Sequence, residues 1–341
     1  MSLIYTFGEF SKKIEKSGMD PHELDSSKID EFTSFFSEQL LNDFKAGINS
    51  DKNKKDRVEF VECVTRKWKN SLASLSNFIQ LNFEIISSYR EKNASTAEKE
   101  DNCQFLALIQ LHSRAILVTK EILVLLENGF PDGAFARWRT LHEIAVCALV
   151  IAYSKDSGKR FLLDEHIKNN KSSKCYNRYH SKLNHSPISS EMMEINEEKE
   201  VEALKVLGEN YKKVQSDYEW ARPFMDSKGF KENARFNFSN LEKETSLDHY
   251  RPYYVWACGK THAASKGNYA DLGTNNKRAF LVGPSNYGLL EPIDCTALTL
   301  TTITSACMSA YPCIDSIVLQ KVIDNLRCMV TDNALSDDKK F

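Results

Sequence analysis

Three ionisable residues stand close together in a segment whose other side chains are mostly apolar. Arg139, His142 and Glu143 lie within residues 130–153, among Phe, Trp, Leu, Ile, Val and Ala. On an α-helix, residues three and four positions apart share one face. A guanidinium, an imidazole and a carboxylate on one face can together bind an anion and move a proton, so the three are candidate catalytic residues.

The same residues also have a structural interpretation, because a charge in an apolar environment is costly unless it is paired. Arg139 and Glu143 could form an ion pair that fixes the register of the helix, with His142 simply hydrogen-bonded. Arg137 points elsewhere, since it lies roughly 160° from Arg139 around an ideal helix; it is a candidate binding residue. The sequence leaves both interpretations open.

A second pair of candidates lies in the tyrosine-rich segment 247–264. Helical spacing puts Tyr254, Cys258 and His262 along one face. His262 is then a candidate catalytic acid or base, and Tyr254 a candidate phosphate-binding residue. The alternative is that His262 caps the end of its helix, where a cation interacts favourably with the helix dipole.

Arg160 and His166 form a weaker pair of candidate binding residues on a polar helix whose charge density is typical of a solvent-exposed face. The histidines and cysteines show no metal-binding spacing such as HExxH or a Cys/His quartet. The segment Gly283-Pro-Ser-Asn-Tyr-Gly lacks the residues of a phosphate-binding or dinucleotide-binding loop. We therefore expect no metal site and no cofactor.

The helices that must position these residues follow from apolar periodicity. Residues 105–126 are apolar around most of a helix, as is typical of the centre of a bundle. Gly129 then supplies a helix stop and Pro131 a new start, and residues 134–153 are again largely apolar. A short connection between two apolar helices predicts a central antiparallel hairpin.

The fold class follows from the same pattern. Gly and Pro are scarce, at 13 and 8 residues, and no alternating strand pattern of useful length is present. The sequence predicts an all-α helical bundle. We expect a polar N-terminal helical extension over residues 1–98 and the helical bundle domain over residues 99–335.

Composition limits the location and the partners. The 45 basic and 47 acidic residues give a net charge of −2, so overall charge does not favour nucleic acid or an anionic membrane. Nine scattered cysteines without a CxxC pair indicate a reducing compartment. Neither a signal peptide nor an apolar run of roughly 20 residues is found. We expect a cytoplasmic protein with no membrane partner.

The segment from Asn128 to Ile144 resembles a helical signature of a widespread bacterial family of uncharacterised proteins. In that family a Gly-x-x-x-Gly-Ala turn precedes an Arg-[Ser/Thr]-Leu-x-Glu helix, here Gly129 to Glu143. Tyr218-Glu-Trp-Ala, the tyrosine-rich helix ending at His262, and Gly283-Pro-Ser-Asn-Tyr-Gly-Leu-x-Glu-Pro also match. The resemblance covers about residues 103–325 and implies membership without naming an activity.

The chain also resembles the HEPN group of helical domains, many of which are metal-independent RNases of toxin–antitoxin, abortive-infection and CRISPR systems. Their Arg-x4-6-His motif is matched by Arg137 with His142 and by Arg160 with His166. The residue after the arginine is usually polar in that group, whereas here it is Trp138 or Phe161.

The HEPN resemblance implies attack of a ribose 2′-OH on the adjacent phosphate. His142 or His262 would act as acid or base, and Arg139 or Arg137 would stabilise the phosphorane charge. It also implies RNA as substrate and a homodimer, because such sites commonly form at a dimer cleft.

Two functions from different classes follow. The first is a HEPN-like endoribonuclease in phage defence or a toxin–antitoxin pair, with a partner protein from that system. The second is a non-catalytic helical binding or sensor module, in which the Arg/His/Glu cluster is structural or holds a small anionic ligand.

Overall fold

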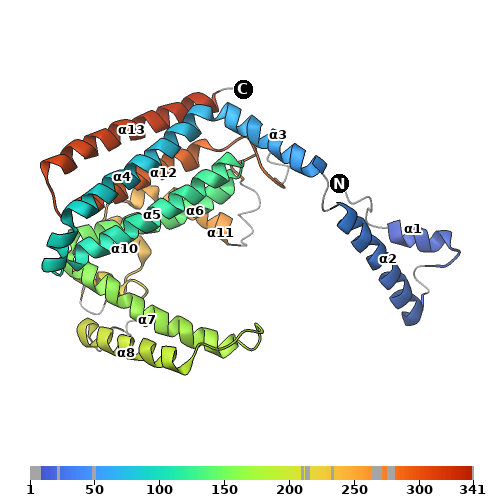
Figure 1. The fold of residues 1–341 in the computed structure, drawn as a ribbon, viewed down its shortest axis with the longest axis horizontal. Coiled ribbons are helices and arrows are strands. Elements are labelled where there is room, and N and C mark those ends of the chain that lie inside the picture. Colours follow the sequence, from blue (N-terminus) through green and yellow to red (C-terminus); the bar gives the residue numbers. More distant parts are fainter. Residues whose placement is uncertain are drawn as a thin grey trace. The chain divides into compact units, whose positions relative to one another are not determined.

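The computed structural model (Figure 1) describes residues 9–20, 24–47, 51–208, 211, 216–231, 234–262, 271–274 and 281–339. Over these residues it contains thirteen α-helices, two short 3-10 helices and no strand, so the predicted all-α class is confirmed. Residues 1–8, where we expected no signal peptide, lie outside the described ranges. Among the described helices, none combines the length and the apolar character that a membrane span requires.

The chain divides into two compact units, Met1–Cys63 and Val64–Phe341. The first unit contains α1 (Glu9–Lys16), α2 (Ser26–Gly47) and most of α3 (Asp51–Lys67). Within it, the rings of Phe32 and Phe36 stack at 6.2 Å.

The second unit is a bundle of five helices, with the long helix α7 (Lys155–Tyr179), α8 (Ser190–Leu207) and several short helices packed around it. The five helices of the bundle are α4 (Lys69–Lys99), α5 (Cys103–Glu127), α6 (Pro131–Tyr153), α12 (Leu290–Met308) and α13 (Ile314–Asp338). The compact units divide at Cys63/Val64, and α4 packs against α5, α12 and α13 within the second unit. The expected domain boundary at 98/99 stays a prediction.

The hairpin of α5 and α6 is built as predicted. Asn128 to Phe130 connect the helices, Gly129 takes a left-handed conformation with φ of 76°, and Pro131 is the first residue of α6. Apolar side chains then pack the two helices together along their length. The predicted central hairpin is therefore confirmed.

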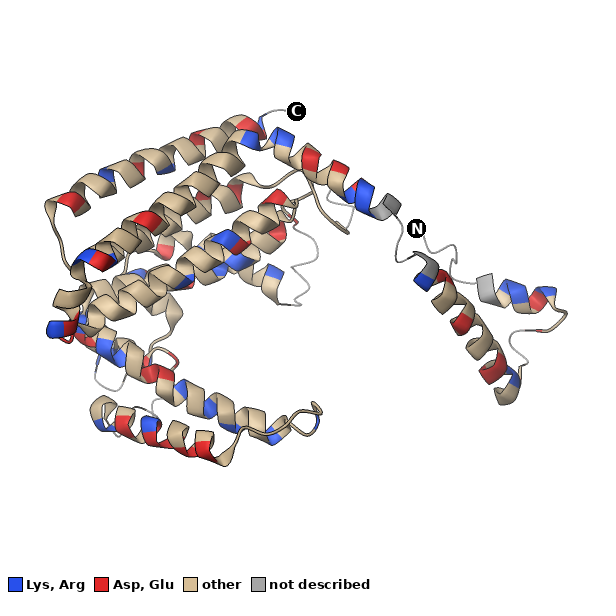
Figure 2. Ribbon diagram, in the orientation of Figure 1, with Lys and Arg blue, Asp and Glu red and all other residues tan. Residues whose placement is uncertain are grey.

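Helix α12 is the central helix of the bundle, since it contacts α4, α5, α6 and α13. It carries only two charged residues, Glu291 and Asp294, whereas charges follow one another along α7 (Lys155–Tyr179) and α8 (Ser190–Leu207) (Figure 2). The indole N–H of Trp138 donates to Thr299 Oγ1 at 2.9 Å, and this hydrogen bond links α6 to α12.

Helices α7 and α8 pair with each other, and α7 also packs on α5. Gly158 permits that approach, because a Cβ at this position would lie 2.8 Å from the Cα of Gln104. The remaining short elements are η1 (Glu219–Ala221), α9 (Arg222–Ser227), α10 (Phe238–Glu244), η2 (Asp248–Tyr250) and α11 (Arg251–Thr261). Of these, α10 and α11 cover α6 at the position of the candidate residues.

Candidate functional site

The side chain of His142, a residue of α6, lies in the protein interior and faces α10. Its side chain is 1% exposed, and Nε2 lies 2.9 Å from Oε1 of Glu242. The ring is enclosed by four aromatic rings with centroids 5.3–6.0 Å away, those of Trp138, Phe238, Tyr250 and Tyr254. With Glu242 ionised, Nε2 of His142 is the donor of this hydrogen bond.

Glu242 reaches His142 because α10 begins with a well-formed cap. Asn237 accepts from the backbone N–H of Asn240, and the Asn240 side chain accepts from the backbone N–H of Asn237. The Glu242 side chain is 1% exposed, and its second oxygen, Oε2, lies 2.5 Å from Nη1 of Arg251 at the start of α11. The buried carboxylate thus has a cationic partner, as a buried charge requires.

The other two residues of the predicted face meet α11. Arg139 Nη2 lies 2.9 Å from Glu143 Oε1, and the Tyr254 hydroxyl donates to that same oxygen at 2.6 Å. The guanidinium carbons of Arg139 and Arg251 each lie 5.2 Å from the centroid of the Tyr254 ring, within cation–π range. We call Arg139, His142, Glu143, Glu242, Arg251 and Tyr254 the Tyr254 cluster.

The electrostatics of the cluster favour paired charges. Burial, followed by the hydrogen bond to Glu143, raises the pKa of Tyr254 above its ordinary value, so the phenol stays protonated at neutral pH. Burial alone would lower the pKa of Arg139, but Tyr254 and Glu143 outweigh it and raise that pKa. Two arginines therefore face two carboxylates, with a neutral phenol between them.

The contacts that the structural interpretation expects are present. Arg139 and Glu143 form an i,i+4 ion pair, and His142 is hydrogen-bonded to a residue of another helix. The predicted convergence of the three residues on one side of α6 is present, since each contacts either Tyr254 or its neighbours. What the cluster can do directly is join α10 and α11 to α6.

Arg137 is not part of the cluster. Its Nε donates to Glu121 on α5, and Nη1 lies 3.4 Å from Thr140 Oγ1. The arginine and histidine of the Arg-x4-His match thus interact with different helices, Arg137 with α5 and His142 with α10.

His262 follows the last residue of α11 and is exposed. Its backbone is extended, with φ of −105° and ψ of 140°, and its N–H donates to Cys258 O at 3.0 Å. Of the two alternatives for His262, the structure has the helix-end position. The helical spacing that grouped it with Tyr254 fails because α11 ends at Thr261.

Arg160 and His166 lie on α7, on different sides of the helix. Arg160 donates to the carbonyls of Leu207 and Glu219 at 3.3 and 3.5 Å, and its guanidinium carbon lies 5.4 Å from the Tyr211 ring centroid. His166 is half-buried and six positions further on, about 240° around an ideal helix. The second Arg-x-His match is therefore not brought together either.

Two of the motifs that carry the family resemblance are in contact. The N–H of Ser285 donates to the carbonyl of Gly129 at 2.7 Å, which joins the loop before α12 to the α5–α6 turn. Asp132 accepts from the N–H of Leu272 at 3.1 Å and lies 3.0 Å from Nζ of Lys260. This turn therefore positions loops as well as starting α6.

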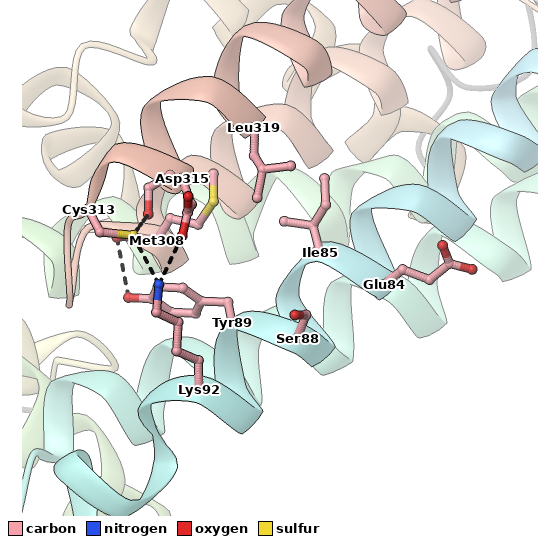
Figure 3. A pocket seen from close by; sticks show the side chains of 10 residues that line it. Glu84, Ile85, Ser88, Tyr89, Lys92, Met308, Cys313, Asp315 and Leu319 are labelled. Carbon is pink, nitrogen blue, oxygen red and sulfur yellow. Dashed lines mark hydrogen bonds and ion pairs between the residues drawn. The ribbon is translucent and has the colours of Figure 1, made fainter.

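A pocket of about 290 Å³ lies elsewhere, between α4 and the α12–α13 junction (Figure 3). Its floor includes Tyr89 and Met308, and Lys92 points across it towards Cys313 and Asp315. Lys92 Nζ is 2.9 Å from Asp315 Oδ2 and 4.0 Å from Cys313 Sγ. None of the lining residues belongs to the Tyr254 cluster.

Hydrogen bonds also distinguish the Cys313 thiol. The Ser316 hydroxyl at 3.4 Å, then the Ser316 N–H, lowers the pKa of Cys313 below its ordinary value, and the Lys92 ammonium adds to this effect. Among the described residues, no three His, Cys, Asp or Glu side chains are placed to hold a metal ion together.

Sequence reasoning missed Glu242, Arg251, and the Cys313 pocket. The signal for α10 was the pair of asparagines at positions 237 and 240, which can cap a helix, followed by Leu241 and Glu242. A helix of seven residues is too short to show apolar periodicity. The pocket is lined by residues more than 200 positions apart in the sequence, so no local sequence pattern predicts it.

The comparisons with known proteins bear on the family. A family model described as a family of unknown function (DUF5677) matches residues 105–279, which include most of α5 and all of α6, α10 and α11. No curated protein and no solved structure matches the chain. The matched range begins near the expected position 103, ends before the expected position 325, and covers more than half of the 341 residues. The chain therefore belongs to the DUF5677 family.

Proposed function

We propose that this chain is a non-catalytic helical binding module, in which the Tyr254 cluster holds α10 and α11 against α6. The observation that carries the proposal is the environment of His142, which is 1% exposed and bound to Glu242 within a shell of aromatic rings. A general acid or base must come within hydrogen-bonding distance of the proton it transfers. A substrate would have to displace both Glu242 and the rings to reach this imidazole.

The charge balance of the cluster supports the same proposal. Glu143 is paired with Arg139, and Glu242 with Arg251, so the cluster offers no uncompensated cation to an RNA phosphate. Of these two pairs, only the Glu242 side chain is fully buried, and removing Arg251 would leave that carboxylate without its cationic partner. Pairing of a buried charge is the role expected of a structural cluster in a binding or sensor module.

The test compares stability and activity in the same variants. His142→Gln should lower the free energy of unfolding by about 2–4 kcal/mol, because Glu242 loses a buried partner. His262→Ala should change it by less than about 0.5 kcal/mol, since that side chain is exposed. Urea denaturation of both purified variants measures these differences.

Ribonuclease activity is tested with the same variants. Expression of each is induced in a bacterial host, and growth of the cells and the integrity of their total RNA are followed. The binding-module proposal expects neither growth arrest nor RNA degradation from the unsubstituted chain. RNA cleavage that disappears in a folded His142→Gln variant would contradict it.

A HEPN-like metal-independent endoribonuclease, acting in phage defence or a toxin–antitoxin pair, is the second candidate. It is favoured by the partly exposed guanidinium groups of Arg139 and Arg251, at 25% and 40% side-chain exposure, on the Tyr254 ring. Within the described chain the Nε–H of Arg139 is buried and has no hydrogen-bond partner, so it is a donor that a phosphate oxygen could accept from. Labelled RNA cleaved in the presence of EDTA, with loss of cleavage in Arg139→Gln, would support this candidate.

A further inference from the structure

The pocket between α4 and the α12–α13 junction combines an apolar wall with a thiol at one end. Ile85, Tyr89 and Met308 are buried in this wall, and Leu319 is half-buried beside them. Figure 3 shows Ile85 and Leu319 pointing towards each other, with Cys313 at the left of the view. The volume of about 290 Å³ is close to the lower limit of about 300 Å³ for ligand pockets. The pocket therefore has room for a small apolar group beside the thiol.

Hydrogen bonds fix the α12–α13 junction that carries Cys313. The Tyr89 hydroxyl donates to the carbonyl of Met308 at 3.3 Å and accepts from the N–H of Tyr311 at 2.8 Å. The hydroxyl of Tyr311 in turn donates to the carboxylate of Glu100 at 2.7 Å. Cys313 follows this junction directly, so its sulfur has a defined position relative to the wall of the pocket. Such a fixed position is what a group that reacts with a bound molecule requires.

The surroundings of the Cys313 sulfur favour its nucleophilic thiolate form. Sγ lies 3.4 Å from Oγ of Ser316 and 4.0 Å from Nζ of Lys92. Cys313 also immediately precedes α13, a helix of 25 residues, at the end where the helix dipole is positive. A cysteine beside a lysine at the start of a helix is in the usual setting of a reactive thiol.

An apolar pocket with a nucleophile at one end fits a particular class of molecule. That molecule must carry an apolar chain for the wall and an electrophilic atom for the sulfur. Acyl thioesters combine the two, and their carbonyl oxygen gains negative charge when a thiolate attacks. The ammonium of Lys92 lies close enough to the Cys313 sulfur to stabilise that charge. A polar disulfide would react with the same thiol but would not use the apolar wall.

We propose that the pocket is an acylation site, at which Cys313 accepts a short acyl chain from a thioester of low molecular weight. The Cys313 sulfur forms a bond to the carbonyl carbon, and the bond from that carbon to the donor sulfur breaks. Cys313 loses its proton to water, the departing thiolate takes one up from water, and nothing is oxidised or reduced. The acyl chain then lies against Ile85 and Leu319.

The proposed acylation site is separate from the Tyr254 cluster. None of the residues that line the pocket belongs to that cluster. The proposal therefore goes beyond the binding module and does not rest on it.

The first experiment incubates the full chain with the acetyl or the hexanoyl thioester of N-acetylcysteamine and follows each cysteine by peptide mass spectrometry. The hexanoyl ester should acylate Cys313 at least about tenfold faster, because each buried methylene is worth up to about a factor of four. Cys175 and Cys328 are exposed outside the pocket, so the two esters should react with them at rates within about twofold of each other. Neutral hydroxylamine should release the acyl group from Cys313, as expected of a thioester.

Ser88→Phe tests whether the pocket causes the preference for the longer chain. Ser88 lines the pocket from an exposed position of α4, so a phenyl ring there can occupy the space of the acyl chain without disturbing the core. The ratio of the hexanoyl rate to the acetyl rate at Cys313 should fall to within about threefold of one. Ser172→Phe, the same change at an exposed position of α7, should leave that ratio at its original value. Circular dichroism of both variants checks that the helices are intact.

Lys92→Met removes the ammonium and keeps an unbranched side chain. Both thioesters should then acylate Cys313 at least about tenfold more slowly, with the ratio of their rates unchanged, because the carbonyl charge loses its partner while the pocket remains. The absence of an acyl group on Cys313, equal rates of the two thioesters there, or a ratio that Ser88→Phe does not lower would each overturn the proposal. So would an unchanged rate in Lys92→Met.

Discussion

His112 is a buried histidine whose surroundings favour the neutral ring. Its side chain is 2% exposed, and Nε2 lies 3.2 Å from Thr304 Oγ1. The Thr304 hydroxyl donates to Asn82 Oδ1 at 2.7 Å, so Nε2 of His112 is the donor to Thr304. Burial lowers the pKa of His112 to about 3. This chain of hydrogen bonds joins α5, α12 and α4 without any charge.

A dependence of stability on pH follows from that lowered pKa. In the unfolded chain His112 takes up a proton below pH 6.5, whereas in the folded chain it stays neutral down to a pH of about 3. Acid therefore favours the unfolded chain between these values, and stability is lost as the pH falls through that window. At pH 5 the contribution of His112 to the loss should be about 2 kcal/mol.

Urea denaturation at pH 7.5 and pH 5 measures the effect. His112→Gln cannot titrate, so its free energy of unfolding should fall less between the two pH values than that of the unsubstituted chain. Equal losses in the two proteins would show that His112 does not cause the dependence.

Cys313 should be the most reactive thiol on the surface of the second unit. Its pKa is lowered, chiefly by the Ser316 hydroxyl, so a larger fraction is thiolate at pH 7 than for an ordinary cysteine. We expect it to react with an uncharged maleimide faster than Cys175 and Cys328, although those two are more exposed. Mass spectrometry of peptides after timed labelling gives the rates.

Ser316→Ala provides the control for this prediction. The substitution removes the hydroxyl, so the pKa of Cys313 should rise and its labelling at pH 7 should slow. Labelling of Cys175 should not change. An unchanged rate at Cys313 would mean that access to the pocket, rather than thiolate formation, sets its reactivity.

At the scale of elements, the Tyr254 cluster joins two short helices to a long one. Glu242 is the only acceptor in the cluster that contacts both His142 and Arg251. In Glu242→Ala, backbone amides of α10 and α11 should therefore exchange with deuterium at least about tenfold faster, as loss of a buried charged hydrogen bond implies. Hydrogen-exchange mass spectrometry follows both helices directly.

The comparison helix in the same experiment is α8, which does not contain cluster residues. Its amides should exchange at an unchanged rate in Glu242→Ala. Glu194→Ala, at an exposed position of α8, should leave α10 and α11 unaffected. Faster exchange throughout the second unit would indicate global destabilisation in place of a local role.

How well each element could be predicted depended on its length. The α5–α6 hairpin was predictable because Gly129 and Pro131 mark its turn and both helices are long enough to show periodicity. The face shared by Arg139, His142 and Glu143 followed from helix geometry alone. Their partner Glu242 did not, because it lies 100 positions away from His142 on a seven-residue helix. The partners of this face of α6 depend on tertiary contacts, which cannot be predicted from local sequence patterns.

At the scale of the whole molecule, the core of the second unit begins before α4. Val64 and Trp68 are 0% exposed, and the Trp68 indole donates to the carbonyl of Asn286 at 3.3 Å. Nζ of Lys67 donates to the same carbonyl at 3.2 Å. The end of α3 thus packs within the second unit, and α4 supplies a large part of its interior.

Truncation tests where the folding unit starts. A chain of residues 51–341 keeps α3 whole and should unfold within about 2 °C of the full chain, because no buried residue of the second unit is lost.

A chain of residues 99–341, cut at the boundary expected from the sequence, removes Leu72, Leu75, Phe78 and Ile79 with the rest of α4. Burial of each such side chain contributes about 1.5–3 kcal/mol to the free energy of unfolding. Summed over the buried residues of α4, this contribution is as large as the total stability of about 5–15 kcal/mol that is usual for a domain. This shorter chain should not fold. Thermal unfolding followed by circular dichroism distinguishes the two, and a cooperative transition in residues 99–341 would place the boundary at 98/99 and make α4 part of the extension.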